Sequence, residues 1–324
     1  MKRCIKLSLT GIILMTFFTF SSCDKSSNEI LNQDDVSISY RISKIYFERE
    51  AYSYFTEYSA DLSYKDDKLN TVSYRINSSS DTSYIRFDYE INSVFQSFYN
   101  SNKEFKSRLT AEFENNKLVF WMIEEDNYNE LEPVEKINYN YNGDKLESFL
   151  TYDYLNDIWR SYMEGNFSYN NDQLNKYKLY FNWNEGPPEE YAVENTYIYE
   201  NNEITFIERI DFGEDGAEDE TYHYYFKYEG SNLNQIENYL INIEDMDSTL
   251  YKSFKFSYDM EGRVQTTLYE DFNYNTKSVW TFEYEEGTGN IKFDKNKLAV
   301  EIIDWHQLEF NETIINDFFI ILPK

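Results

Sequence analysis

The sequence is poor in the residues on which disulfides, metal centres and flexible linkers depend. Its two cysteines are Cys4 and Cys23, both near the amino terminus, so packing without disulfides is expected to stabilise the remaining chain. Four prolines and ten glycines exclude a linker rich in either residue. The two histidines, His223 and His306, lie far apart and form no zinc-binding pattern. No phosphate loop, dinucleotide fingerprint or nucleophile elbow occurs, so the sequence contains no recognisable catalytic motif.

Positive charge is also scarce. The chain has 30 lysines and arginines against 59 aspartates and glutamates, which gives a formal net charge of −29 at pH 7. A surface this acidic argues against nucleic acid as a partner and against electrostatic attachment to anionic lipid headgroups. A neutral partner, a cationic partner or a divalent metal ion is compatible with it.

The amino-terminal segment resembles a bacterial lipoprotein signal. Cations among the first six residues precede the mainly apolar run Leu7–Phe20, which is too short to span a membrane, and Ser21-Ser22-Cys23 follows. The pattern predicts a signal peptide over residues 1–22, a lipidated Cys23 and a polar tether over residues 23–37. The protein is then expected at the cell envelope, anchored by lipid to the outer membrane, in a leaflet that the sequence leaves open. An ordinary cleaved signal with a spare cysteine is the alternative.

Aromatic residues are abundant, and they recur at regular intervals. They make up 19% of the chain, which contains 32 tyrosines. Each repeat has an aromatic at the end of a strand, a turn rich in Asn, Asp and Gly, and then Leu, Ile or Val. From Phe113 onward the aromatic anchors are 26 to 30 residues apart. The anchors are Tyr64, Phe113, Tyr141, Tyr169, Tyr199, Tyr228, Tyr258 and Tyr284, with Tyr89 as a weaker candidate.

The strands before these turns alternate between apolar and polar residues. Phe254, Phe256 and Tyr258 share one face, and Lys255 and Ser257 share the other. This period of two, with one polar face, indicates an antiparallel sheet. After each turn the apolar residues are three positions apart, which breaks the alternation and predicts a β-bulge beside the turn.

The repeats predict an all-β fold. Units of about 28 residues, each with two strands, cannot bury their aromatic faces alone and must pack as an array. Residues 38–295 are therefore expected to form an antiparallel meander of about 16–18 strands, in a curled or flattened barrel-like shell with its aromatic face inward. A membrane barrel is the alternative, but its aromatics would be confined to two girdles, whereas tyrosine here runs along whole strands.

Residues 296–324 break the repeat period and are interpreted as a cap on the array. Leu298–Phe310 fits either a strand or an amphipathic helix, and Phe318–Leu322 fits a final covered strand.

One repeat resembles a known family. Tyr258-Asp259-Met260-Glu261-Gly262-Arg263-Val264 is similar to the Tyr-Asp-x-x-Gly-Arg-Leu core of the YD, or rearrangement-hotspot (RHS), repeat. The other units keep the aromatic, the turn and the aliphatic residue, but mostly lack the Gly-Arg pair. The chain is similar to lipoproteins of Gram-negative bacteria with degenerate YD-like hairpin repeats, over about residues 38–295. This resemblance implies a β-hairpin repeat fold and an envelope location, and it implies no particular activity.

Two kinds of candidate site are present. Trp159, Trp183 and Trp280 are candidates for stacking on a ligand, since a tryptophan on a rigid sheet can hold a sugar ring or anchor a protein partner. Rings that pack back onto the sheet are the alternative. The acidic loop Asp211–Glu220 resembles a calcium loop in part, with Asp211, Asp215 and Asp219 as candidate ligands, although an ordinary acidic hairpin also fits. No other cofactor is expected.

The function predicted from the sequence is a non-enzymatic binding or scaffold role at the cell envelope, with a glycan or an envelope protein as the ligand. No catalytic residue is assigned. The alternative is an envelope glycan hydrolase that uses a pair of carboxylates. Such an enzyme would need two convergent carboxyl groups about 5–10 Å apart, with the pKa of at least one raised by burial.

Overall fold

The computed structural model describes the greater part of the chain. The described residues are 40–51, 54–76, 82–115, 117–127, 130–181, 191–212, 218–242, 247–289, 291–293 and 319–321. Every regular element among them is a β-strand. None of them belongs to a helix of the length and apolarity needed to cross a membrane.

Twenty strands are described. They are β1 (Tyr40–Ala51), β2 (Tyr54–Lys65), β3 (Lys68–Ile76), β4 (Thr82–Tyr89), β5 (Ser93–Tyr99), β6 (Phe105–Glu114), β7 (Lys117–Asn127), β8 (Glu130–Asn142), β9 (Lys145–Leu155), β10 (Ile158–Asn170), β11 (Gln173–Phe181), β12 (Tyr191–Glu200), β13 (Glu203–Phe212), β14 (Glu218–Glu229), β15 (Asn232–Ile241), β16 (Ser248–Tyr258), β17 (Val264–Asp271), β18 (Thr276–Glu286), β19 (Ile291–Phe293) and β20 (Phe319–Ile321).

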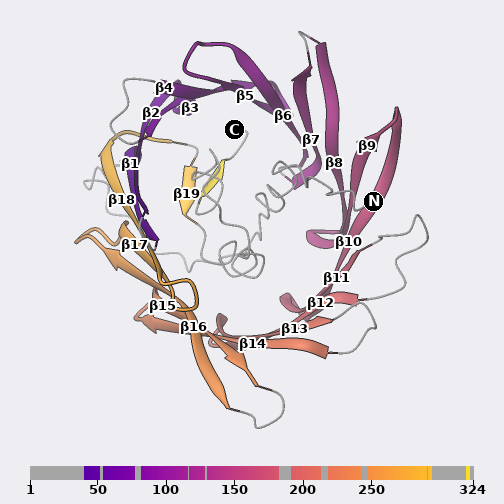
Figure 1. Ribbon diagram of the computed structural model, residues 1–324, viewed down its shortest axis with the longest axis vertical. Helices are drawn as coiled ribbons and strands as arrows, with labels where there is room; N and C mark the ends of the chain where they lie inside the picture. The colour runs from indigo at the N-terminus through magenta and orange to yellow at the C-terminus, as the bar shows by residue number, and fades with distance from the viewer. Residues whose placement is uncertain are drawn as a thin grey trace, which may run out of the picture.

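Strands β1 to β18 form one closed antiparallel barrel. Each strand pairs with the next one in the sequence, and β1 pairs with both β2 and β18. At the seam, Ile45 lies opposite Phe282 and Phe47 lies opposite Trp280. Figure 1 shows the resulting ring, whose sheet is curled round and not flattened. The predicted all-β class, antiparallel meander and strand number are confirmed.

A β-bulge recurs beside the turns, as the three-residue offset predicts. In the β2–β3 hairpin the register shifts between Ser63 and Tyr64, and in β14–β15 it shifts between Lys227 and Tyr228. The turns themselves contain left-handed residues, such as Asn201 with φ 52° and Asn202 with φ 66°. Asn, Asp and Gly tolerate this conformation best, which explains the composition of the turns.

Five of the anchor tyrosines connect their hairpin to the strand before it. The hydroxyl of Tyr258 donates a hydrogen bond of 2.7 Å to the carbonyl oxygen of Leu233, in the preceding hairpin. Burial raises the pKa of Tyr258 to about 12, so the hydroxyl keeps its proton at neutral pH. Four other anchors donate in the same way, and we call these five bonds the tyrosine staples: Tyr64 to Ile42, Tyr89 to Leu69, Tyr228 to Ile204 and Tyr284 to Val264.

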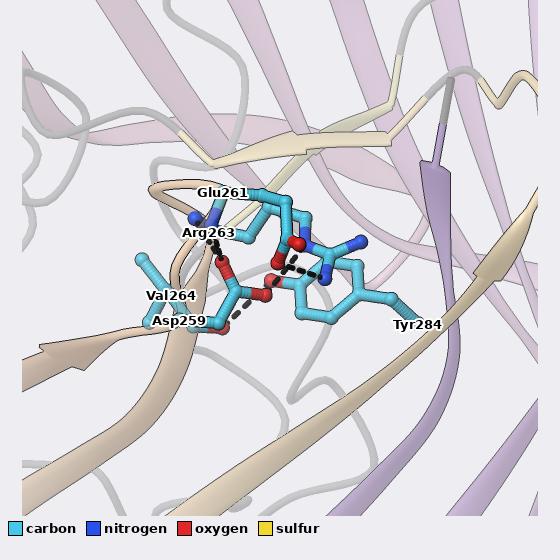
Figure 2. Close-up of polar contacts among 5 residues, drawn as sticks. All are labelled: Asp259, Glu261, Arg263, Val264 and Tyr284. Carbon is cyan, nitrogen blue, oxygen red and sulfur yellow. Dashed lines mark hydrogen bonds and ion pairs between the residues drawn. The ribbon is translucent and has the colours of Figure 1, made fainter. Parts of the chain in front are cut away.

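The unit that keeps the Gly-Arg pair lies next to the barrel seam (Figure 2). The carboxylate of Asp259 accepts hydrogen bonds from the backbone N–H of Glu261 and Arg263 and from Nε of Arg263. The Arg263 guanidinium lies 4.8 Å from the ring centroid of Tyr284 on β18 and 4.1 Å from that of Tyr40 on β1. Its cation–π contacts therefore join the two strands that close the barrel.

The side of the sheet with the buried side chains points into the ring. Each of the 18 barrel strands contributes at least one buried hydrophobic residue, and Tyr64 packs against this core. The segment after β18 crosses the same side, because a Cβ atom on Gly289 would lie 3.1 Å from Cε1 of Tyr64. That segment leads to β19, which is seen within the outline of the ring in Figure 1 and pairs with β20. This is the inward orientation expected for the shell-like arrangement, in which tyrosine runs along whole strands.

Candidate binding site on the outer wall

Alternation along β8, β9 and β10 produces a polar outer surface opposite the core. Ile137 and Phe149 are buried on the inner side, so Asn138 and Leu150, their neighbours in the sequence, point outward. A hollow of about 280 Å³ opens among these outward side chains. We call it the outer hollow. It is lined by Asn138, Asn140, Ser148, Leu150, Tyr152 and Glu164, with Tyr139 and Phe149 beneath.

The polar groups of the outer hollow are held by short-range hydrogen bonds. Asn166 donates from Nδ2 to Oε1 of Glu164 at 2.9 Å, two residues away on the same strand. Asn140 donates from Nδ2 to Oε2 of Glu147 at 3.4 Å. Amide and carboxylate groups positioned in this way can donate to and accept from the hydroxyl groups of a ligand.

Aromatic side chains flank the hollow on the same outer wall. The ring centroid of Trp159 lies 5.0 Å from that of Tyr154, its cross-strand neighbour. Nζ of Lys136 lies 4.2 Å from the centroid of the Trp159 ring and 5.0 Å from that of Tyr152. We call these four residues, Lys136, Tyr152, Tyr154 and Trp159, the Trp159 cluster. Because Tyr152 also lines the hollow, the cluster and the hollow form one continuous site.

A tight turn places Trp159 at this position. Asn156 and Asp157 connect β9 to β10 with φ values of 52° and 62°. Two consecutive left-handed residues fit the twist of a hairpin and fix its register. This register sets Trp159 opposite Tyr154, and the predicted stacking candidate is therefore half-buried on the outer wall, beside other rings.

The other two predicted stacking residues are Trp280 and Trp183. The structure corrects the prediction for Trp280, whose side chain is 4% exposed in the inward core, 5.0 Å from the ring of Phe47. A ring this deeply buried cannot stack on an outside ligand, and its inward direction follows from the β17–β18 register, which the sequence alone does not give. Trp183 lies outside the described residues, as does the predicted lipidation site, Cys23.

The calcium candidates are only partly described. Asp211 is paired with Arg209, which donates from Nε and from a terminal nitrogen to the two carboxylate oxygens. Asp219 is exposed on β14, and Asp215 lies outside the described residues. In the part of the chain that the structure describes, no group of three or more His, Cys, Asp or Glu side chains could hold a metal ion.

A pair of carboxyl groups lies on the inner side of the same three strands. Glu135 on β8 is opposite Asp153 on β9, and its side chain is 2% exposed. The hydroxyl of Tyr162 donates to Oε1 of Glu135 at 3.2 Å. Burial, reinforced by the charge of Asp153, raises the pKa of Glu135 to about 8. Partial burial of its carboxyl group also raises the pKa of Asp153, although much of this residue is exposed. Glu135 was not among the candidates, because its burial depends on strand pairing.

The fold and this surface define a closed antiparallel barrel of repeated hairpins with a small open hollow on its outer wall. No protein-family model and no curated protein matches the chain. Among solved structures, a porin-like protein from Bacteroides uniformis is 10% identical, over 75% of this chain and 98% of its own, with a TM-score of 0.41.

Two further solved structures have similarly low sequence identity and lower TM-scores. A porin-like protein from Bacteroides vulgatus is 11% identical, over 75% of this chain and 98% of its own, with a TM-score of 0.36. A chain of the TcdB2-TccC3-Cdc42 complex is 11% identical, over 73% of this chain and 14% of its own, with a TM-score of 0.28. TM-scores below 0.5 do not establish a shared fold, so the site itself must indicate the function.

Proposed function

We propose that this protein is a non-enzymatic glycan-binding lipoprotein of the cell envelope, and that it binds its ligand on the outer wall of the barrel. The observation that carries the proposal is the outer hollow with the Trp159 cluster beside it. Aromatic rings offer a flat apolar surface to the C–H face of a sugar, while amide and carboxylate groups bind its hydroxyls.

The size of the site favours a glycan over a protein. The hollow of about 280 Å³ is near the lower limit for small-molecule sites, which begin at about 300 Å³. A stable protein interface buries about 800 Å² on each partner and has an apolar centre. Asn138, Asn140, Ser148 and Glu164 add polar groups to a hollow that Leu150 and Tyr152 also line, and this mixture fits the hydroxyls and the apolar face of a sugar.

Replacing Trp159 by alanine is expected to weaken glycan binding at least about tenfold, because a central ring contributes much of the energy of such a site. The ligand is first found by screening residues 24–324 against a glycan array. Affinities of the hit for the wild type, for Trp159→Ala and for the hollow variant Asn138→Ala are then measured by titration calorimetry.

Tyr84→Ala serves as the matched control. Tyr84 lies on the outer wall of β4, stacked on Tyr99 at 4.5 Å and away from the hollow, so its loss is expected to leave the affinity unchanged. Melting temperatures show whether each variant is folded. Wild-type affinity in a folded Trp159→Ala protein would contradict the proposed site.

The membrane anchor is a second part of the proposal, based on Phe20-Ser21-Ser22-Cys23. Mass spectrometry of protein extracted from membranes is expected to find acyl chains on an amino-terminal Cys23, and Cys23→Ala is expected to leave the membrane fraction. A single acyl chain holds a protein only marginally, so several chains are expected. Cys23→Ala protein that remains tightly bound to membranes would contradict the anchor.

A hydrolase remains the second candidate, because the structure contains one feature that it requires. Glu135 keeps a proton at neutral pH beside Asp153, as a general acid beside a base or nucleophile would. Product analysis of each glycan that binds distinguishes the two functions. Binding without cleavage supports the binding protein, and cleavage that is lost in Glu135→Gln would support the hydrolase.

A further inference from the structure

A second group of rings lies on the outer wall, on β13, β14 and β15. Phe206 is 5.0 Å from the ring of His223 and 5.2 Å from that of Tyr225, and Tyr225 is 5.7 Å from Tyr239. These rings point outward because Ile207 and the other neighbours along the strands are in the inward core. We call the four residues the Phe206 cluster. Tyr225 is its most accessible member, with 41% of its surface exposed.

Polar groups are interleaved with these rings. The hydroxyl of Tyr239 donates to Oε2 of Glu237 at 3.1 Å, and Nζ of Lys227 lies 2.6 Å from the other oxygen of that carboxylate. Nε2 of His223 lies 3.5 Å from Oε1 of Glu208. The cluster is therefore not a continuous apolar patch of the kind that a protein partner buries. Its mixture of rings and polar groups matches that of the outer hollow.

The two clusters lie on one continuous stretch of the outer wall. In one row across the strands, Asn166 lies opposite Lys178, and Lys178 lies opposite Glu194. In the adjacent row, the partners from β11 to β14 are Lys176, Thr196, Glu208 and His223. Across the strands, β10 and β13 are three strand spacings or about 14 Å apart, and along β10 Trp159 lies nine residues before Ser168, the partner of Lys176, which adds about 30 Å in the strand direction. Polar side chains lie between the two clusters, where Lys176 and Lys178 both form ion pairs with Glu194, and Ile198 is exposed on β12 opposite Phe206. We call this stretch, from the Trp159 cluster to the Phe206 cluster, the outer strip.

The outer strip is close to neutral, although the chain as a whole carries −29. Hydrogen bonds from Lys176 and Lys178 outweigh the effect of burial, which acts in the opposite direction, and lower the pKa of Glu194, so this residue is ionised at neutral pH. A strip this close to neutral attracts neither an anionic nor a cationic ligand strongly over a distance. Its four lysines are Lys136, Lys176, Lys178 and Lys227, and its six acidic residues are Glu147, Asp157, Glu164, Glu194, Glu208 and Glu237, so its formal charge is 4 − 6 = −2.

From these observations we infer that the outer strip binds a neutral polysaccharide chain, which contacts the Trp159 cluster and the Phe206 cluster at the same time. The inference rests on the proposed glycan-binding function and names the class of glycan. A ligand long enough to reach both clusters gains avidity, because its second contact is intramolecular. A short oligosaccharide can occupy only one cluster at a time and binds more weakly.

The test compares chain lengths. Neutral β-glucan, xylan and mannan polysaccharides are run with the protein in affinity gel electrophoresis, and their hexasaccharides are titrated by calorimetry. The polysaccharide that binds is expected to bind at least tenfold more tightly, per site, than its own hexasaccharide. Tyr225→Ala and Trp159→Ala are each expected to lower the polysaccharide affinity towards that of the hexasaccharide. The double variant is expected to abolish binding, and Tyr84→Ala to leave it unchanged.

The outcomes separate this inference from the proposed function. If Trp159→Ala abolishes binding and folded Tyr225→Ala binds the polysaccharide like the wild type, the outer hollow is a glycan site and the extended strip is wrong. Tighter binding of an acidic polysaccharide, such as a polyuronate, would overturn the neutral class. If no glycan of any length binds and a protein partner binds instead, both the proposed function and the inference are wrong.

Discussion

Replacing Gly165 by alanine is expected to destabilise the barrel by about 3 kcal/mol, at the upper end of the usual range for an overpacked core. A Cβ atom at this position would lie 2.1 Å from Cε1 of Phe149 and 2.5 Å from Cζ. Gly165 and Phe149 are direct cross-strand partners on β10 and β9, and the ring lies over the glycine backbone. A glycine in a strand interior often marks such a close approach.

The ring cannot move away without loss, because it packs among other aromatics on the inner wall. Its centroid is 6.3 Å from Tyr139, 6.1 Å from Phe167 and 6.5 Å from Tyr177. At about 2–4 °C for each kcal/mol, the melting temperature of Gly165→Ala is expected to fall by about 6–12 °C. Thermal unfolding monitored by circular dichroism measures this fall.

Two controls make the Gly165 result specific. Gly143→Asn changes a turn glycine with φ +60° and open space around it, so only a small effect is expected. In the double variant Gly165→Ala with Phe149→Leu, the smaller side chain makes room for the new methyl group, and the two changes are expected to cost less than their sum. A Gly165→Ala protein as stable as the wild type would show that the ring is not held as described.

Replacing Glu135 by glutamine is expected to remove much of the fall in stability between acidic and alkaline pH. Glu135 has a folded pKa of about 8, against an ordinary value of 4.5. Between these values the folded state binds a proton that the unfolded state has lost. The free energy of unfolding therefore falls by about 1.4 kcal/mol for each pH unit, or by about 5 kcal/mol in total, and changes no further above pH 8 through this group.

The direction of this pH dependence determines at which pH the wild type and Glu135→Gln differ in stability. A carboxyl group with a raised pKa gives its full stability below pH 4.5 and loses it as the pH rises through 8. Glutamine cannot ionise and can still accept the hydrogen bond from Tyr162. Glu135→Gln is thus expected to match the wild type near pH 4.5 and to be more stable above pH 8.

Urea unfolding at a series of pH values measures the difference, with Glu132→Gln as the control for loss of one glutamate from an exposed site on the same strand. An unchanged pH dependence in Glu135→Gln would mean that Glu135 is already ionised in the folded protein at neutral pH.

The hairpins and their bulges could be predicted because each depends on only a few consecutive residues. The aromatic before each turn, the left-handed turn residues and the three-residue offset together predict hairpins with a bulge, and the bulge at Tyr64 and its counterparts is where the offset puts it. The tyrosine staples were not predicted. They join residues 20 to 25 positions apart through a backbone carbonyl, and no side-chain pattern marks the acceptor.

The candidate site was harder to predict because it depends on contacts between strands. Trp159 could be singled out by residue type, but the outer hollow needs the β8–β9 and β9–β10 registers that bring Asn138, Leu150 and Glu164 together. Glu135 is one acidic residue among 59, and only its inward direction makes it unusual. Trp280 shows the same limit, since alternation gives two faces and does not say which one a ligand can reach.

Because β1 pairs with β18, every strand in the ring has two neighbours, and the order of the strands does not depend on which of them comes first in the chain. The β1–β18 pair is antiparallel, as the sequential pairs are, with Tyr40 opposite Glu286 at one end and Ala51 opposite Thr276 at the other. The start of β1 and the end of β18 are thus adjacent. If a short linker joined them and the chain were cut at another hairpin turn, all 18 strands would keep their partners, and the ring would still have no free edge through which two molecules could pair.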